Sequence, residues 1–295
     1  MEWKQKFVER YSGLTDMDKF IEASLKPLRK TIRVNTLKTT VNEMKNRFKL
    51  EQIPWCKEGF YIDGTSIGNT IEHFLGYIYL QGAASMIPAL ALDPKPEEKV
   101  LDMCAAPGSK TSQIAAMMKN RGVIIANDHK LDRIKPLTLN LQRCGVLNAI
   151  VTQMEGYWFE GMNFDKVLVD APCSGVGTIR KSYKSLQMWN PNLVKQMCGI
   201  QKRLLITAAE LVNPGGTVVY STCTLEPQEN EEVISWLLDK KPDMKVKKID
   251  LPLKRGKPVE EFEGKTYNSE VRKCLRLWPQ DNDTEGFFVA KLVKE

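Results

Sequence analysis

The stretch LDMCAAPGSKT, residues 101–111, decides the fold because it leads from a buried strand to a helix through a loop of small residues. The apolar run 99–105 predicts the strand, and TSQIAAMMKN (111–120) predicts the helix. Gly108 and the small residues before it let the backbone approach a ligand, and the helix N-terminus faces the same place. Neither GxxxxGK[ST] nor GxGxxG is present, so the stretch indicates neither a phosphate-binding loop nor a dinucleotide site.

Strands and helices continue to alternate along the rest of the chain. Further strands are expected at 122–128, 149–154, 164–172, 217–223, 245–250 and 286–294, and helices at 131–145, 191–212 and 227–240. Near-continuous apolar strands alternating with helices are typical of a mostly parallel sheet covered on both faces. We therefore expect an α/β fold with a seven-stranded sheet, whose ligand lies at the carboxyl ends of the strands.

The first 80 residues have a different pattern. Helical spacing occurs at 2–11, 17–25 and 40–50, and short strand-like segments occur at 31–37, 59–64 and 77–82. We expect a small N-terminal α+β module at residues 1–80 and a catalytic domain at residues 81–295.

Composition excludes several classes of protein. The chain has 295 residues, and its seven cysteines are scattered beside only two histidines, which does not favour a zinc site or any other metal site. No signal peptide and no membrane span is evident, so we expect a cytoplasmic protein, and a monomer. The net charge is +7, with basic clusters at 26–33, 180–184, 245–248 and 254–257. This excess is compatible with a nucleic-acid partner.

A carboxylate follows the second strand of the alternating region. Asp128 stands at the end of that strand, where an acid can accept hydrogen bonds from both ribose hydroxyls of an adenosine. An adenosine site without a phosphate loop favours S-adenosylmethionine as the cofactor. Asp102 would then either face the methionine amino group or cap the next turn.

With these residues identified, the chain resembles the RNA cytosine-5 methyltransferase family, which includes the Sun-domain proteins and the bacterial 16S ribosomal RNA enzyme. The matching blocks are QGAASMIPALALDP (81–94), LDMCAAPGSKT (101–111), NDHKLDR (127–133), VDAPCSGVGTIRK (169–181), YSTCTLEPQENE (220–231) and RLWPQDNDTEGFFVAKL (276–292). The compact length looks most like an archaeal tRNA member. The resemblance implies a Rossmann-like methyltransferase fold and methylation of carbon 5 of cytidine in RNA, with tRNA favoured over ribosomal RNA.

The resemblance also implies roles for individual residues. By this resemblance, Cys223 matches the nucleophile and Cys173 matches the thiol that assists product release. Asp170 would lie between cofactor and base. Glu155 stands where the family often has an acid followed by alanine near the adenine, and we expect it to take that role. The residues expected around the cofactor are Cys104, Ala105, Ala106, Pro107, Gly108, Ser109, Lys110, Asp128, Arg133, Glu155 and Asp170.

The chemistry itself explains a need for two groups near the base. A thiolate that adds to carbon 6 of cytosine makes carbon 5 nucleophilic, and a base must later remove the proton from carbon 5. Cys173 lies on a proline-containing turn, and Cys223 ends a strand just before a helix. Chemistry alone does not rank the two thiols, and only the resemblance assigns the attack to Cys223. We expect a protonated Asp170 to stabilise charge at N3 of the base.

The remaining expectations concern RNA and packing. We expect RNA contacts from Arg29, Lys30, Arg33, Asn35, Arg180 and Lys181. Trp189 either stacks on a base or packs in the core, and we favour packing. Cys56, Cys144, Cys198 and Cys274 are expected to be buried packing residues.

Three alternatives remain open. The first is an rRNA substrate, and the second is an amino-group methyltransferase, which would want an Asp/Asn-Pro-Pro-aromatic turn instead of DAPC. The third is a non-enzymatic RNA-binding protein on the same scaffold. An accessory protein is also not excluded by the sequence.

Overall fold

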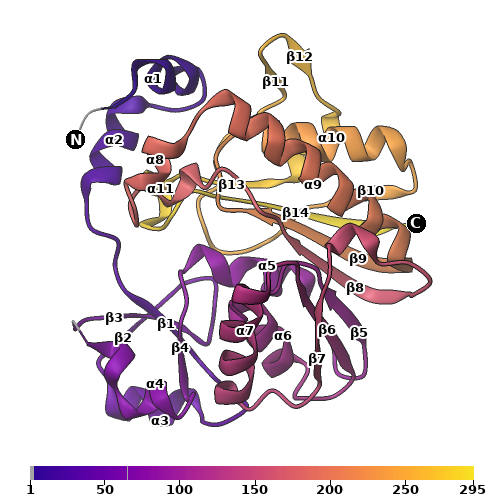
Figure 1. Cartoon of the computed structure of the whole chain (residues 1–295). Helices are drawn as coiled ribbons and strands as arrows, with labels where there is room; N and C mark the ends of the chain where they lie inside the picture. The colour runs from indigo at the N-terminus through magenta and orange to yellow at the C-terminus, as the bar shows by residue number, and fades with distance from the viewer. Residues whose placement is uncertain (1–2, 65) are drawn as a thin grey trace.

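The central sheet of the computed structural model, which describes residues 3–64 and 66–295, has its parallel strands in the order β9-β8-β5-β6-β7 (Figure 1). Two antiparallel strands extend the β9 edge, first β14 and then β10, and β13 also pairs with β14. The bounds are β5 Lys99–Asp102, β6 Val123–Asp128, β7 Ala149–Gln153, β8 Phe164–Asp170, β9 Val212–Thr222, β10 Met244–Lys247, β13 Leu275–Leu277 and β14 Phe287–Lys294. The expected mostly parallel sheet is confirmed, and β13 is a strand that the sequence did not indicate.

Helices cover both faces of this sheet because successive strand residues point to opposite sides. In β8, Val167 and Val169 pack against the face that carries α9 and α10, whereas Leu168 packs on the other face, under α5 and α6. The bounds of the covering helices are α5 Ile87–Leu92, α6 Ser109–Met117, α7 Leu131–Cys144, α9 Pro191–Leu211 and α10 Glu231–Lys240.

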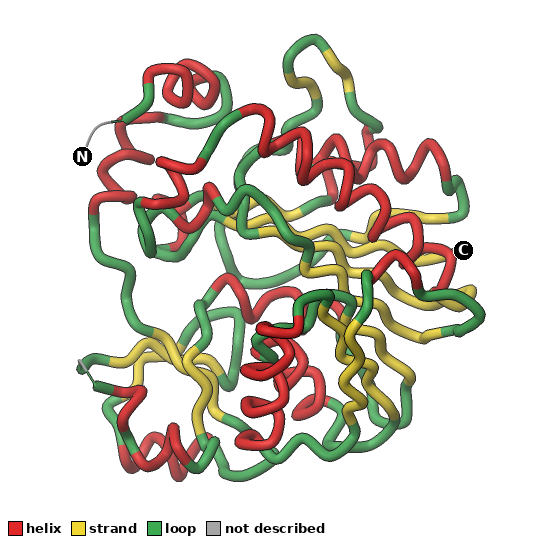
Figure 2. Tube along the Cα trace, in the orientation of Figure 1, coloured by secondary structure: helices red, strands yellow, loops and turns green. Residues whose placement is uncertain are grey.

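Residues 3–64 and 66–80 form two parts, which lie at different places on the rest of the chain (Figure 2). Helices α1 (Gln5–Ser12) and α2 (Met17–Leu25) share a hydrophobic cluster with Trp189 and Trp278. The second part is a four-stranded sheet of order β2-β3-β1-β4 with α3 and α4, and it has its own core. Its bounds are β1 Thr31–Val34, α3 Val41–Arg47, β2 Leu50–Gln52, β3 Gly59–Ile62, α4 Ile71–Phe74 and β4 Ile78–Leu80.

Several expected boundaries differ from the structure, and two of the differences have a clear cause. The strand expected from residue 217 begins at Val212, because Phe164 of β8 already pairs there before a register shift. The helix expected over 227–240 is interrupted at Asn230, whose φ of −117° and ψ of −94° are not helical. It therefore consists of the 3-10 helix η5 (Pro227–Glu229) followed by α10.

Short segments complete the chain. They are α8 (Lys184–Met188), α11 (Pro279–Asn282), the hairpin of β11 (Glu261–Phe262) and β12 (Lys265–Thr266), and the remaining 3-10 helices η1 Ile67–Asn69, η2 Ala84–Met86, η3 Gly156–Trp158, η4 Val176–Thr178 and η6 Ser269–Lys273. None of the helices in the described part of the chain has the length and apolarity that crossing a membrane requires.

Candidate active site

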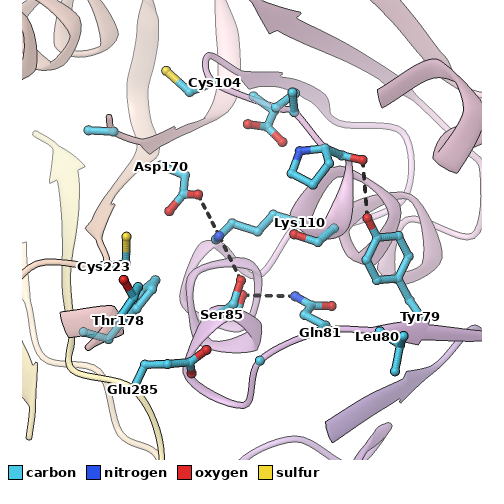
Figure 3. Close-up of a pocket in the computed structure, with 18 of the residues that line it drawn as sticks. Tyr79, Leu80, Gln81, Ser85, Cys104, Lys110, Asp170, Thr178, Cys223 and Glu285 are labelled. Atoms are coloured by element: carbon cyan, nitrogen blue, oxygen red, sulfur yellow. Dashed lines mark hydrogen bonds and ion pairs between the residues drawn. The ribbon is translucent and has the colours of Figure 1, made fainter. Parts of the chain in front are cut away.

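A cavity of about 370 Å³ opens at the carboxyl ends of β5, β8 and β9, where the topology predicts a ligand (Figure 3). The loop after β5 forms one wall, and segments from β4 and from the start of β14 form others. The residues that line the cavity include Ser85, Asp102, Cys104, Ala105, Ala106, Pro107, Ser109, Lys110, Asp170, Thr178, Lys181, Cys223, Glu285 and Phe287.

The loop between β5 and α6 is held by backbone contacts. The amide of Ala105 donates to the carbonyl of Asn127 at 2.7 Å, and the amide of Gly108 donates to the carbonyl of Ala105 at 2.7 Å. Gly108 has a φ of 97°, which favours glycine, and it immediately precedes the first turn of α6. The side chains before it are small, so the loop backbone itself borders the cavity.

Asp102 ends β5 beneath this loop and is fully buried. Thr111 donates to its Oδ2 at 2.7 Å, whereas Oδ1 has no partner among the described residues. Burial raises the pKa of this carboxyl to about 7. A buried carboxylate oxygen without a donor suits a bound ammonium group, which favours the first of the two roles that the sequence left open for Asp102.

Asp128 and Arg133 lie beside the loop on its other side. Asp128 Oδ2 accepts a hydrogen bond from the amide of Ala106 at 3.3 Å and faces Arg133 at 3.3 Å. Arg133 in turn donates to the carbonyl of Ala106 at 2.7 Å. Neither residue lines the cavity in the described structure, and the same holds for Glu155 before the 3-10 helix η3. Their assignment to the cofactor stays a prediction.

The centre of the cavity contains an ion pair that the sequence did not indicate. Lys110 Nζ lies 2.7 Å from Asp170 Oδ2 and donates to Ser85 Oγ at 3.0 Å, as Figure 3 shows. Ser221 Oγ donates to the other oxygen of Asp170 at 2.7 Å. Asp170 thus lies in the cavity between Lys110 and Ser221, and its expected role as a protonated donor to N3 of the base stays a prediction.

The two cysteines of interest meet at the edge of the cavity. The Sγ atoms of Cys173 and Cys223 are 3.4 Å apart, although the residues lie in different turns. Cys223 lines the cavity, whereas Cys173, which is also partly exposed, is not among the lining residues. The hydrogen bond to Cys223 and burial raise the pKa of the Cys173 thiol well above its usual range.

Two residues that were expected to contact RNA are buried, and we correct that expectation. Arg33 is 2% exposed and donates to Gln81 Oε1 and Ser112 Oγ, each at 2.8 Å. Asn35 is fully buried and donates to the carbonyls of Gly76 and Cys144. Both side chains fasten the small N-terminal sheet to the catalytic domain, so they do not face RNA in this structure.

The other four basic residues differ in exposure. Arg180 also turns inward, because its guanidinium binds Asp283 and the carbonyl oxygens of Lys26 and Pro27. Its side chain is only 3% exposed, so an RNA contact does not fit it. Lys181 is exposed and lines the cavity. Arg29 and Lys30 lie on the surface, where Arg29 pairs with Glu51 and Lys30 donates to the carbonyl of Gly64.

The remaining sequence predictions concern packing. Trp189 is 3% exposed and its Nε1 donates to Glu226 Oε1 at 2.6 Å, which confirms packing over base stacking. The four cysteines expected in the core, Cys56, Cys144, Cys198 and Cys274, are all buried. Among the described residues, no three His, Cys, Asp or Glu side chains gather as a metal-binding group.

Sequence reasoning missed several residues of the site. Three residues fall inside quoted sequence blocks but received no role: Ser85, Glu229 and Glu285. A polar residue inside an apolar block, such as Ser85 in ASMIPALAL, was the available signal. Their proximity to the thiols or to Lys110 depends on contacts between distant segments, which the sequence pattern does not reveal.

Comparison with known proteins gives consistent results. A family described as 16S rRNA methyltransferase RsmB/F matches residues 89–293, and the N-terminal domain of 16S rRNA methyltransferase RsmF matches residues 4–83. The tRNA (cytosine(49)-C(5))-methyltransferase of Pyrococcus abyssi is 52% identical over 98% of this chain and 96% of the relative.

Two further relatives extend the comparison. The ribosomal RNA small subunit methyltransferase F of Pectobacterium carotovorum is 41% identical over 94% of this chain, but the match spans only 59% of that relative. Among solved structures, a methyltransferase homolog protein from Pyrococcus horikoshii superposes with a TM-score of 0.88 at 42% identity, covering 99% of this chain and 96% of the other.

Proposed function

The chain belongs to the 16S rRNA methyltransferase RsmB/F family, and we propose that it methylates carbon 5 of cytidine in RNA with S-adenosylmethionine as methyl donor. The observation that carries this proposal is the convergence of Cys223, Lys110 and Asp170 in one cavity beside the loop 104–110. We favour tRNA as the substrate, because the relative named as a tRNA enzyme matches nearly its full length.

The residues around the loop after β5 fit the cofactor. The unpartnered Oδ1 of Asp102 suits the methionine ammonium group, and the small side chains of the loop leave room along the backbone. Asp128, with Arg133 beside it, would bind the ribose, and Glu155 would lie near the adenine. When bound, S-adenosylmethionine supplies an electrophilic methyl group. The protein's part is to hold it between the loop and Asp170.

Cys223 is the proposed nucleophile. It lines the cavity in which a cytosine taken out of its stack would lie, whereas Cys173 does not. Its thiolate would form a bond to carbon 6, and the displaced electron pair makes carbon 5 nucleophilic. Carbon 5 would then attack the methyl group, and the bond between that methyl and the sulfonium sulfur would break, with its electron pair left on the sulfur of the departing thioether.

Lys110 and Asp170 would stabilise the base during this step. Electron density moves toward N3 and O2 when the thiolate adds, and a cation that lies in the cavity opposes that charge. Lys110 has both the charge and hydrogens to donate, and Asp170 together with Ser85 fixes its position. In this proposal the ammonium group of Lys110 stabilises the charge on the base, the role that the sequence analysis expected of a protonated Asp170.

Release requires removal of the proton from carbon 5 before the bond to Cys223 breaks. The Sγ of Cys173 lies 3.4 Å from the Sγ of Cys223, so it would lie near a base bonded to Cys223. The Cys173 thiol would first give its own proton to water, and the resulting thiolate would then accept the proton of carbon 5 directly or through water. The electron pair of the C5–H bond then restores the ring double bond and expels Cys223 as a thiolate.

The wider assignments concern RNA binding and the division of the chain into domains. We propose that residues 1–80 bind RNA and residues 81–295 carry out catalysis, with Lys181 at the rim of the cavity and Arg29 and Lys30 on the N-terminal surface as phosphate contacts. The boundary at residues 80 and 81 and a monomeric enzyme stay predictions.

The test is to incubate the protein with tritiated S-adenosylmethionine and transcribed tRNA or a 16S rRNA fragment, and to identify the labelled nucleoside. We expect 5-methylcytidine, formed faster on tRNA. Methyl on an exocyclic nitrogen, or no transfer to either RNA, would contradict the proposed reaction. Faster transfer to the rRNA fragment would contradict only the choice of substrate.

A further inference from the structure

A buried carboxyl group lies behind the turn that bears Cys173. Glu229, in the 3-10 helix η5, accepts a hydrogen bond from the backbone amide of Ser174 at 3.0 Å. Gln201 of α9 donates to the same carboxylate oxygen at 2.8 Å and also donates to the carbonyl of Pro172. Glu229 thus holds Ser174 directly and Pro172 through Gln201.

Glu229 differs from the acids around it in having no cation. Glu226 pairs with Arg10 at 2.9 Å, and Glu231 pairs with Arg276. Glu229 is equally buried, yet its Oε1 has no hydrogen-bond partner among the described residues, and no ion pair of the described part of the chain includes it. A buried carboxyl without a cation costs stability, so a fold that retains one beside a reactive turn suggests a role in the reaction.

The titratable groups that face this carboxyl directly are two thiols, a phenol and another acid. They are Cys173 on the turn after β8, Cys198 on α9, Tyr220 on β9 and Glu226 just before η5, with Cys223 beyond Cys173 and Lys202 of α9 near Cys198. Burial raises the pKa of Glu229 to about 7. Its negative charge in turn contributes to the raised pKa of Cys173. This arrangement opposes further negative charge on the Cys173 side of the thiol pair.

We propose that Glu229 is a positioning residue that keeps the resting proton on Cys173, so that the thiolate of the pair forms on Cys223. The Sγ atoms are 3.4 Å apart, so Cys173 then donates a hydrogen bond to the Cys223 thiolate. The carboxyl acts through the thiols and does not touch the base. This inference rests on the proposed assignment of Cys223 as nucleophile, but its test needs neither RNA nor cofactor.

The experiment measures thiol alkylation by iodoacetamide at a series of pH values, with the peptides of Cys173 and Cys223 quantified by mass spectrometry from initial rates. In the wild type we expect Cys223 to react at least tenfold faster than Cys173 at pH 8. In Glu229→Gln we expect Cys173 to react about tenfold faster than in the wild type. An unchanged Cys173 rate in this variant, or a Cys173 rate equal to that of Cys223 in the wild type, would overturn the proposal.

Two matched variants separate charge from support of the turn. Glu229→Asp keeps the charge and should leave Cys173 slow, whereas Gln201→Leu removes the amide bridge but keeps the carboxyl. If Gln201→Leu accelerates Cys173 as much as Glu229→Gln does, Glu229 only supports the turn and the proposal is wrong.

A further variant keeps the test decisive if Glu229→Gln does not fold. In Cys223→Ser the Cys173 thiol should still titrate clearly above the ordinary cysteine value of about 8.5, because Glu229 remains. A midpoint at the ordinary value would show that Cys223 alone raised it, and would overturn the proposal. Absence of methyl transfer by the wild type, with this alkylation pattern intact, would instead contradict the proposed function.

Discussion

The end of β9 and the turn after β8 each carry a cysteine, but they surround the two sulfur atoms with different groups. Cys223 borders the cavity with Lys110 and Asp170, whereas Cys173 is not among the lining residues and lies next to Ser174, whose amide binds the buried carboxyl of Glu229. The proposed roles of the two thiols rest on this difference. In the proposal, position relative to the cavity selects the group that meets the substrate, and the electrostatic surroundings select the group that keeps its proton.

The contrast between the two thiols is tested most severely by removing Cys223, the thiol that faces the cavity. Cys223→Ala should lower methyl transfer by about 10³-fold or more, because it removes the proposed nucleophile. Initial rates of tritium transfer to tRNA measure the effect. The control is Cys274→Ala, at a buried cysteine outside the cavity, which should retain activity. A Cys223 variant within tenfold of the wild type would refute the assignment.

The two turns are also joined by their backbones, which suggests a second test. Gly177 donates to the carbonyl of Cys223 at 2.9 Å, and its own carbonyl accepts from Gly286. A Cβ at Gly177 would overlap the carbonyl of Gly286 and lie 2.7 Å from the oxygen of Cys223. Gly177→Ala should therefore cost about 2–4 kcal/mol of the free energy of unfolding and separate the two thiols.

The matched control for that variant is Gly199→Ala in α9, where an added Cβ meets no atom within 4 Å. It should stabilise the helix by about 0.5–1 kcal/mol. Urea unfolding measures both changes. Equal effects of the two substitutions would show that the contact between the turns does not contribute to the free energy of unfolding.

The carboxyl behind Cys173 predicts a dependence of stability on pH. The pKa of Glu229 is raised from 4.5 to about 7 in the folded protein, so the folded state binds more protons than the unfolded state between these values. The free energy of unfolding should then fall as pH rises from about 4.5 to 7, by up to about 3 kcal/mol from this group. Asp102 acts in the same direction.

Glu229→Gln should remove the Glu229 part of that slope and leave the Asp102 part. Urea unfolding at pH 5 and pH 7 measures the difference. Glu160→Gln, at an exposed position, controls for the loss of one negative charge. A slope in Glu229→Gln equal to that of the wild type would show that Glu229 does not titrate in this range.

The smallest expected effect lies at the rim of the cavity, beyond both thiols. Lys181→Ala should weaken tRNA binding less than tenfold and lower the slope of log Kd against log salt by about 1, because one phosphate contact is lost. Lys57→Ala, at a lysine whose side chain is 90% exposed and lies outside the cavity, should leave the slope unchanged. Equal slopes in the two variants would exclude a phosphate contact at Lys181.

Much of this architecture was predictable because it depends on local patterns. Apolar runs placed the parallel strands, and small residues with Gly108 placed the ligand loop at the end of β5. The parallel topology alone then brings Asp170 and Cys223, which end neighbouring strands, to one edge of the sheet. The resemblance, and not the pattern, ranked the two thiols.

The direction of long polar side chains was not predictable from the sequence. Arg33, Asn35 and Arg180 look like surface residues of a basic protein, but partners on distant segments draw them inward. The carbonyl of Cys144 that binds Asn35 is 109 residues away in the chain. The pairing of Lys110 with Asp170, 60 residues apart, escaped prediction for the same reason.

The central claim is that Cys223 attacks and Cys173 releases, and one gel measures it directly. Cys173→Ala and Cys223→Ala are each incubated with labelled tRNA and S-adenosylmethionine, and then run under denaturing conditions. The account predicts that Cys173→Ala accumulates protein covalently bound to RNA, because attack proceeds and release does not, while Cys223→Ala shows no such band. A covalent band in Cys223→Ala and none in Cys173→Ala would reverse the two roles and contradict the account.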